Sequence, residues 1–115
     1  YGMVLGGSFC NVYHNVLAFN LNFGLNYQDP SNNNPLRNNI LAFNGTPSII
    51  GASGNTGNVR EYNCYWTDNP SGGSNNINQD PLFVNGAALD FRLQGSSPCL
   101  GTGTNLGYGL NRGAY

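Results

Sequence analysis

The feature that most constrains the fold of this chain is an internal repeat with a period of about 24 residues. Residues 12–20 (VYHNVLAFN) align with residues 36–44 (LRNNILAFN), and five of the nine aligned positions are identical. The next equivalent step reaches residues 62–66 (YNCYW), which continue the same columns. A fixed period of this length indicates that the chain stacks one structural unit on the next.

The aligned positions form columns that we expect to stack in the folded chain. Polar, aliphatic and aromatic columns are all present: Asn15, Asn39 and Asn63; Val16, Ile40 and Cys64; Phe19 and Phe43. Stacked Asn side chains can hydrogen-bond along such a column, as they do in other in-register β stacks. Phe19 over Phe43 predicts an internal aromatic stack. A second set of columns is expected where residues 2–5, 24–27 and 47–50 align, which puts Met3 beside Leu25 and Leu25 beside Ser48.

Each unit consists of short apolar stretches interrupted by clusters of Gly, Asn, Asp and Pro, which are strand and turn signals. No segment of helical length carries a helical pattern, and the Leu ladder of leucine-rich repeats is absent, so the common helical and leucine-rich arrays are excluded. We therefore expect an all-β chain that forms a parallel β-helix (a solenoid) of about four to five coils of roughly 24 residues. Asn suits left-handed turn positions, and Gly clusters are expected at the corners.

Composition narrows the classes of function. The 115-residue chain holds 21 Asn and 17 Gly, and only 8% of its residues are charged, against ~25% in an ordinary soluble domain. Asn and Gly are poor helix formers, which excludes a long helix or coiled coil. A net charge of −1 offers no basic stripe for nucleic acid. No apolar run approaches the ~20 residues that a membrane-spanning helix needs.

The last third of the chain carries motifs that resemble a known family. They are residues 78–84 (NQDPLFV), 90–94 (DFRLQ), 97–99 (SPC) and 112–115 (RGAY). With residues 62–66, these motifs are similar to the last full coil and the closing segment of secreted bacterial right-handed parallel β-helix proteins. The resemblance implies a right-handed coil and an extracellular or cell-surface location. It also implies a group rich in polysaccharide-acting enzymes and adhesins.

Under this resemblance, residues 1–80 form β-helix coils and residues 81–115 form a closing or capping segment of the same domain. Two positions depart from the family pattern. Cys99 stands where the family has a small residue, and Arg112 stands where a carboxylate is usual. Both departures are compatible with the expected fold, but they mean that no functional role can be carried over from the family.

Few side chains are available for catalysis. A polysaccharide lyase needs a base and a cation near the substrate carboxylate, yet the chain has no Lys and its four Arg are scattered. A hydrolase needs two carboxylates that flank one bond, and three of the five acidic residues lie in Pro-containing turns, where Asp caps backbone N–H groups. His14 has no nucleophile or carboxylate in its column, which favours a surface or ladder role. We therefore predict no catalytic residue, no metal site and no cofactor.

The three cysteines cannot all pair with one another. Cys64 shares a column with Val16 and Ile40, which predicts a buried thiol that packs like a small hydrophobe. Cys10 lies beside the first repeat and Cys99 lies in the closing segment, so a bridge between them would cross most of the body and is not expected. The redox state of the three thiols stays open.

Tyr65 and Trp66 are the candidate carbohydrate-binding residues. They are adjacent in a predicted strand, so their side chains point to opposite faces and one of them faces outward. An outward aromatic ring could serve as a platform for a sugar. The alternative is that it packs against the closing segment.

These patterns leave a preferred function and two alternatives. The first is a non-catalytic extracellular structural or adhesive module. Nothing near Tyr1 resembles a cap, so the first coil is expected to pair with copies of the chain or with upstream chain, and head-to-tail contacts that do not close produce fibres. The second is the C-terminal portion of a polysaccharide lyase or glycoside hydrolase whose catalytic coils lie upstream. The weakest is a glycan-binding module. All three imply a secreted or cell-surface protein, with extracellular polysaccharide as a candidate partner.

Overall fold

Parallel β-strands dominate the computed structural model of the chain. Tyr1, expected at the first coil, and Tyr115, part of the closing motif, lie outside the described residues. The structure describes residues 2–51, 55–68, 70 and 72–114. Its elements are β1 (Met3–Leu5), β2 (Val12–Tyr13), β3 (Val16–Ala18), β4 (Leu25–Tyr27), β5 (Leu36–Arg37), β6 (Ile40–Ala42), β7 (Ile49–Gly51), β8 (Arg60–Glu61), β9 (Cys64–Trp66), β10 (Ile77–Asn78), β11 (Phe83–Asn85), the short 3-10 helix η1 (Gly86–Ala88) and β12 (Asp90–Leu93).

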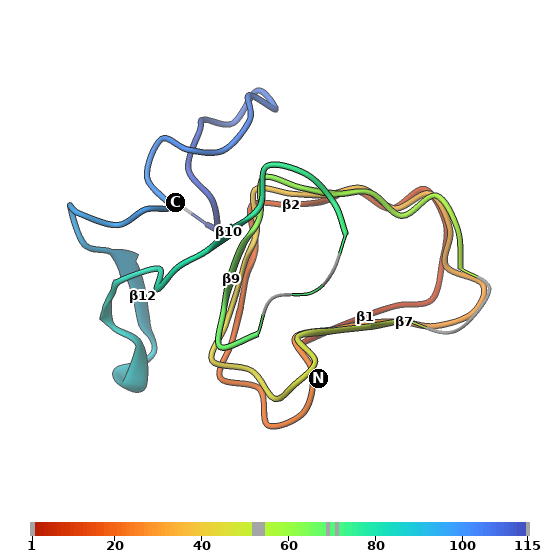
Figure 1. Cartoon of the computed structure of the whole chain (residues 1–115), viewed down its shortest axis with the longest axis horizontal. Coiled ribbons are helices and arrows are strands. Elements are labelled where there is room, and N and C mark those ends of the chain that lie inside the picture. Colours follow the sequence, from red (N-terminus) through yellow and green to blue (C-terminus); the bar gives the residue numbers. More distant parts are fainter. Residues whose placement is uncertain (1, 52–54, 69, 71, 115) are drawn as a thin grey trace.

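Three parallel sheets are built mainly from strands that lie three places apart in the chain. Their strand orders are β1-β4-β7, β2-β5-β8 and β10-β9-β6-β3. We call each set of three consecutive strands a rung, so that the first rung is β1 to β3, the second is β4 to β6 and the third is β7 to β9. Figure 1 shows the rungs superposed, with each strand over its counterpart in the next rung. The rungs match because each supplies similar short apolar segments in the same order.

The register of the sheet that contains β3, β6 and β9 follows the sequence repeat. Val16 pairs with Ile40, and Ile40 pairs with Cys64. The three residues are those of the expected aliphatic column, so the repeat predicts this pairing correctly. The column is continuous through all three rungs.

The sheet of β1, β4 and β7 follows the expected alignment in only one of its two pairings. Met3 pairs with Leu25, as expected. Leu25 pairs with Ile49 rather than with Ser48, so the expected register between β4 and β7 is wrong by one residue. The error has a physical reason: consecutive apolar residues in a short strand fit two adjacent registers equally well, and only the pairing decides which side chains face inward.

The corners between β2 and β3, and their equivalents in later rungs, use left-handed backbone at residues other than glycine. His14, Asn38 and Tyr62 have φ values of 56°, 57° and 56°. Phe19 and Phe43, which follow β3 and β6, have φ values of 56° and 55°. The expected Gly clusters do not form these corners, although Gly72 and Gly73 have left-handed backbone in the turn between β9 and β10. Left-handed backbone costs a non-glycine residue roughly 1–2 kcal/mol, so these corners need a compensating interaction.

Side chains of the strands form two separate apolar clusters, because successive residues in a strand face opposite sides. The inner cluster lies inside the rungs and comprises Val12, Leu17, Leu25, Tyr27, Leu36, Leu41, Ile49 and Tyr65. The outer cluster lies on the opposite face of β6 and β9, and its buried members are Ile40, Ala42, Cys64, Phe83 and Cys99. The column of Val16, Ile40 and Cys64 thus faces away from the interior of the rungs.

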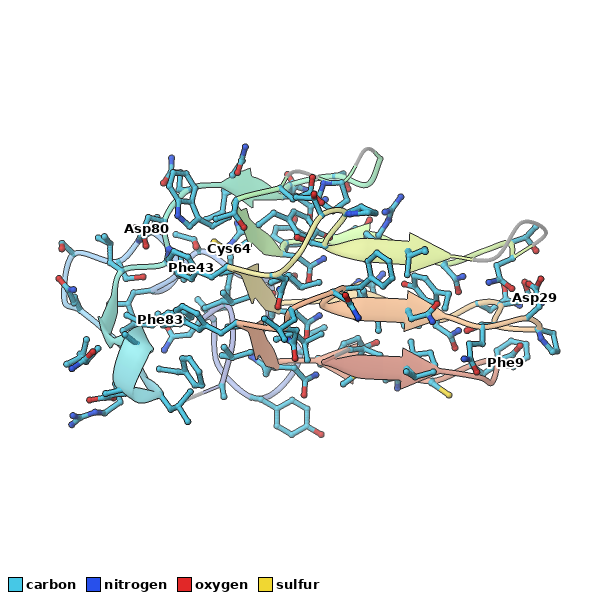
Figure 2. The ribbon with its side chains drawn as sticks, turned by 90° about the horizontal axis from the view of Figure 1, so that it is seen from below. Phe9, Asp29, Phe43, Cys64, Asp80 and Phe83 are labelled. Atoms are coloured by element: carbon cyan, nitrogen blue, oxygen red, sulfur yellow. The ribbon has the colours of Figure 1, made fainter. Side chains whose placement is uncertain are left out.

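Residues 81–114, which we call the flank segment, cover this outer face. Figures 1 and 2 show the segment beside the sheet that contains β9, along the side of the stacked rungs. It contacts the first rung through Phe91, whose ring lies 6.2 Å from that of Phe19, and the third through Arg112, whose Nη1 donates to Asn63 O at 2.8 Å. A segment that closes one end of the stack was expected. It packs along the side instead, because the outward apolar column needs cover.

Candidate functional site

The column of Asn15, Asn39 and Asn63 forms a continuous hydrogen-bonded ladder. The backbone N–H of Asn15 donates to Asn39 Oδ1 at 3.0 Å, and that of Asn39 donates to Asn63 Oδ1 at 3.0 Å. The ladder extends one position further, since the N–H of Asn63 donates to Asn76 Oδ1 at 2.9 Å. The side-chain amide also reaches the preceding rung: Asn39 Nδ2 donates to Val12 O at 2.8 Å. Asn39 and Asn63 therefore each join two rungs through both the side-chain acceptor and the side-chain donor.

Two further ladders were not predicted. At one corner, the N–H of Asn20 donates to Asn44 Oδ1 at 3.1 Å. At another, the N–H of Cys10 donates to Asn34 Oδ1 at 2.7 Å, and that of Asn34 donates to Asn58 Oδ1 at 2.9 Å. All these donors and acceptors are separated by 24 residues. The same offset is the signal that identifies them: Asn20 and Asn44 end the best-aligned segments, and Cys10, Asn34 and Asn58 lie outside those segments.

The ladders explain how the left-handed corners are stabilised. In the ladder that starts at Asn15 and in the one that starts at Asn20, the residue before each Asn has left-handed backbone, as His14 does before Asn15 and Phe19 before Asn20. Asn39 and Asn63 are fully buried. A buried amide without partners would cost about 1–3 kcal/mol, and each satisfied hydrogen bond contributes about 1 kcal/mol. Several such bonds per rung are enough to offset the backbone strain, so the ladders fix where the chain turns.

The ladders have a direction. At each later position, Oδ1 accepts a hydrogen bond from the rung before, as Asn39 does from Asn15. In the first rung, Nδ2 of Asn15 donates to Tyr13 O at 3.0 Å and Nδ2 of Asn20 donates to Ala18 O at 3.3 Å. Within the described part of the chain, neither Oδ1 accepts a hydrogen bond. The first rung therefore presents two amide oxygens at the positions where a preceding rung would donate.

An open cavity lies at the first rung. It has a volume of about 640 Å³ and is lined by apolar and polar residues of the first rung, Asn11 and Asn15 among them, together with Leu106 and Tyr108 of the flank segment. Met3 and Leu5 are partly buried against the inner cluster at this end. The cavity thus exposes the end of the inner cluster, and Leu106 and Tyr108 form one wall of it.

The aromatic column forms a stack, but on the outside of the rungs. The rings of Phe19 and Phe43 are 4.8 Å apart with an interplanar angle of 11°. Phe91 and Phe83 of the flank segment lie 6.2 Å and 6.3 Å from these two rings, and 5.2 Å from each other. The expectation of a stack inside the rungs is therefore wrong in location: left-handed backbone after each strand turns the rings outward, where the flank segment completes a four-ring cluster.

Tyr65 and Trp66 do point to opposite sides of β9. Tyr65 is fully buried in the inner cluster, and burial raises the pKa of its hydroxyl to about 12. A sugar cannot reach it in this structure. Trp66 is half-buried and packs against the outer cluster. Both carbohydrate binding at Trp66 and its packing against the flank segment remain predictions.

Among the described residues, the acidic side chains and His14 do not converge on a common centre. Arg37 Nε lies 2.9 Å from Glu61 Oε2, and hydrogen bonding to Glu61 raises the pKa of Arg37. Hydrogen bonding to Arg92 lowers the pKa of Asp90 to about 2. His14 Nε2 lies 3.3 Å from the Nδ2 of Asn38. Across residues 2–51, 55–68, 70 and 72–114, no three His, Cys, Asp or Glu side chains gather as a metal ligand set.

Comparisons with protein-family models, curated proteins and solved structures found no significant match. The resemblance of the closing motif therefore remains an expectation. Within the described ranges, none of the helical structure is long or apolar enough to cross a membrane.

Proposed function

We propose that the chain is a right-handed parallel β-helix module with a structural or adhesive role outside the cell, and that its copies stack head to tail through the first rung. The observation that carries this proposal is the pair of amide oxygens, on Asn15 and Asn20, at the open start of two directional ladders. The extracellular location is supported by the resemblance of the closing motif, and the absence of catalysis by the dispersed charges.

The strand edges of the first rung support stacking. β1, β2 and β3 each stand at the end of their sheet in the described structure. The N–H of Met3 donates to Gly24 O, and Leu5 O accepts from the N–H of Gln28, so both residues are bonded to the second rung. Val4 lies between them, and its backbone groups point to the open side because successive residues of a strand alternate. Such an edge is a template for another strand.

The direction of the ladders fits a second copy of the chain in the same orientation, and an upstream part of the same chain would meet the first rung by the same rule. Asn58 and Asn76 are the last Asn residues of their ladders and mark the opposite end. A further rung beyond them would accept from their backbone N–H groups, by the same rule that operates between all other rungs. The two ends are complementary: one offers N–H donors and the other offers amide oxygens. The exposed end of the inner cluster would be covered in the same contact.

The test is the assembly state of the purified chain over a range of concentrations. Sedimentation velocity should show association that increases with concentration, and electron microscopy should show linear assemblies rather than closed rings. A chain that remains monomeric at every concentration would overturn the proposal.

A matched pair of variants at Val4 isolates the edge contact. Val4→Pro removes the N–H that points to the open side and should weaken association at least tenfold, whereas Val4→Ala keeps that N–H and should associate as the wild type does. Val4 is exposed, so neither change disturbs the inner cluster. Circular dichroism and the Tm verify that both variants stay folded. Equal association by the two variants would exclude β1 as the contact.

A further inference from the structure

We propose that Cys64 and Cys99 are a disulfide-forming pair that can tie the flank segment covalently to the third rung. Cys64 begins β9, and Cys99 lies in the flank segment after β12. Both residues are fully buried in the outer cluster. Their side chains interact within this one cluster, and both thiols are free in this structure.

The surrounding hydrogen bonds hold the two cysteines in place. Cys64 Sγ donates to Gln79 O at 3.2 Å. The backbone N–H of Arg112 donates to Cys99 O at 2.8 Å, and Nη1 of Arg112 donates at 2.8 Å to Asn63 O, in the residue before Cys64. Arg112 therefore connects the backbones of both cysteines, and the pair is positioned by contacts from the rungs and from the flank segment.

The charge of Arg112 favours a thiolate at this site. Its side chain is 4% exposed, and its guanidinium donates only to neutral oxygens: Asn63 O, Asn75 O, Thr102 O and Thr102 Oγ1. No carboxylate pairs with it within the described residues. A buried cation without a counterion is costly. A negative sulfur beside Arg112 would supply that counterion.

The two thiols are not equivalent. Contact with Cys64 lowers the pKa of Cys99, and Ser97 and Arg112 act in the same direction against the effect of burial. The mutual contact and burial together raise the pKa of Cys64. Cys99 is therefore the more acidic thiol of the two, and we assign the attack on the oxidant to it.

A small oxidant such as hydrogen peroxide can complete the reaction at a buried site. The Cys99 thiolate attacks one peroxide oxygen, the O–O bond breaks and hydroxide leaves, which gives a sulfenic acid. The sulfur of Cys64 then attacks the Cys99 sulfur, the S–O bond breaks, and the departing hydroxide takes the Cys64 proton as water. Over both steps, two thiols and one peroxide give one disulfide and two waters.

Cys10 serves as an internal control, because it is exposed and belongs to the first rung. Figure 2 shows its neighbour Phe9 toward the right-hand end of the molecule, well away from Cys64. The experiment treats the folded full-length Cys10→Ser chain with hydrogen peroxide and analyses it by mass spectrometry without reduction. We expect the intact mass to fall by two hydrogen atoms, and a proteolytic digest to contain one linked product joining Cys64 to Cys99. Survival of both thiols would overturn the proposal, as would their oxidation to sulfinic acids without a link.

Thermal unfolding adds a second readout. The oxidised chain should have a Tm roughly 10 °C above that of the reduced chain, and reduction should reverse the gain. Cys64→Val, which places the residue of position 16 in the same column, and Cys99→Ala should each remove this difference. A difference that persists in either variant would overturn the assignment of the pair.

Discussion

The inner and outer apolar clusters share strands but depend on different parts of the chain. In β6, Leu41 faces the inner cluster and Ile40 faces the outer one. The buried members of the inner cluster all come from the rungs, whereas Phe83 and Cys99 of the flank segment complete the outer cluster. The same strands therefore contribute to two different unfolding events. Loss of the inner cluster unfolds all the rungs together, whereas loss of the outer cluster can release the flank segment alone.

The largest effect is expected inside the rungs. Leu41 is fully buried, and Leu41→Ala should destabilise the whole chain by about 4 kcal/mol because it leaves a cavity that both neighbouring rungs line. Chemical denaturation monitored by circular dichroism measures this loss. Leu21→Ala is the matched control, since Leu21 is 97% exposed and its truncation should change stability by less than about 0.5 kcal/mol. A similar effect of the two changes would remove the distinction between core and surface.

A smaller and more local effect is expected in the outer cluster. Phe91→Ala should cost about 2 kcal/mol, because the half-buried ring contacts Phe19 and Phe83. Hydrogen exchange should then show faster exchange in β11 and β12 and unchanged protection in β4 to β6. Phe9→Ala, at a ring that is 78% exposed, is the control. Faster exchange throughout the rungs would show that the two clusters unfold as one unit.

The smallest effect is expected on the pH dependence of stability, and it comes from an exposed ion pair in the flank segment. Asp90 Oδ2 accepts from Arg92 Nη2 at 2.6 Å, and this bond holds the pKa of Asp90 at about 2, below its ordinary 3.8. Since the folded-state pKa is the lower one, the carboxylate favours the folded form above pH 3.8, and this contribution is lost as the pH falls from 3.8 to about 2. Asp90→Asn and Arg92→Gln should both flatten the Tm profile in that window. An unchanged slope in both variants would show that the pair contributes nothing.

Contacts between rungs could be predicted because the repeat places equal side chains at equal offsets. Asn15 and Asn39 occupy equivalent environments, and one step of the repeat is all that is needed to bring them together. The one-residue error in the sheet of β1, β4 and β7 has the opposite cause. Leu25 pairs with Ile49, but Ile50 is just as apolar, so the composition of the strand does not distinguish the two registers.

The path of the flank segment and the corners could not be predicted from the repeat. Arg112 reaches Asn63 across 49 residues, and no periodic signal indicates such a contact. The corners at His14 and Phe19 contradict local preference, because left-handed backbone favours Gly or Asn. There the decisive interactions are made by the residue that follows, through hydrogen bonds to another rung. At these corners, hydrogen bonds to residues 24 positions away outweigh the local backbone preference.

The direction of the asparagine ladders restricts the symmetry that an assembly can have. Two chains that met with their first rungs face to face would oppose the amide oxygens of Asn15 and Asn20 to the same oxygens of the partner, with no N–H between them. A twofold axis through this face would therefore leave the ladder acceptors unpaired in a closed contact, at a cost for each of them. Translation along the stack pairs acceptor with donor at every step. In the head-to-tail stacking that we propose, the polarity of these amides thus disfavours a symmetric dimer through the first rung and favours open, one-way growth.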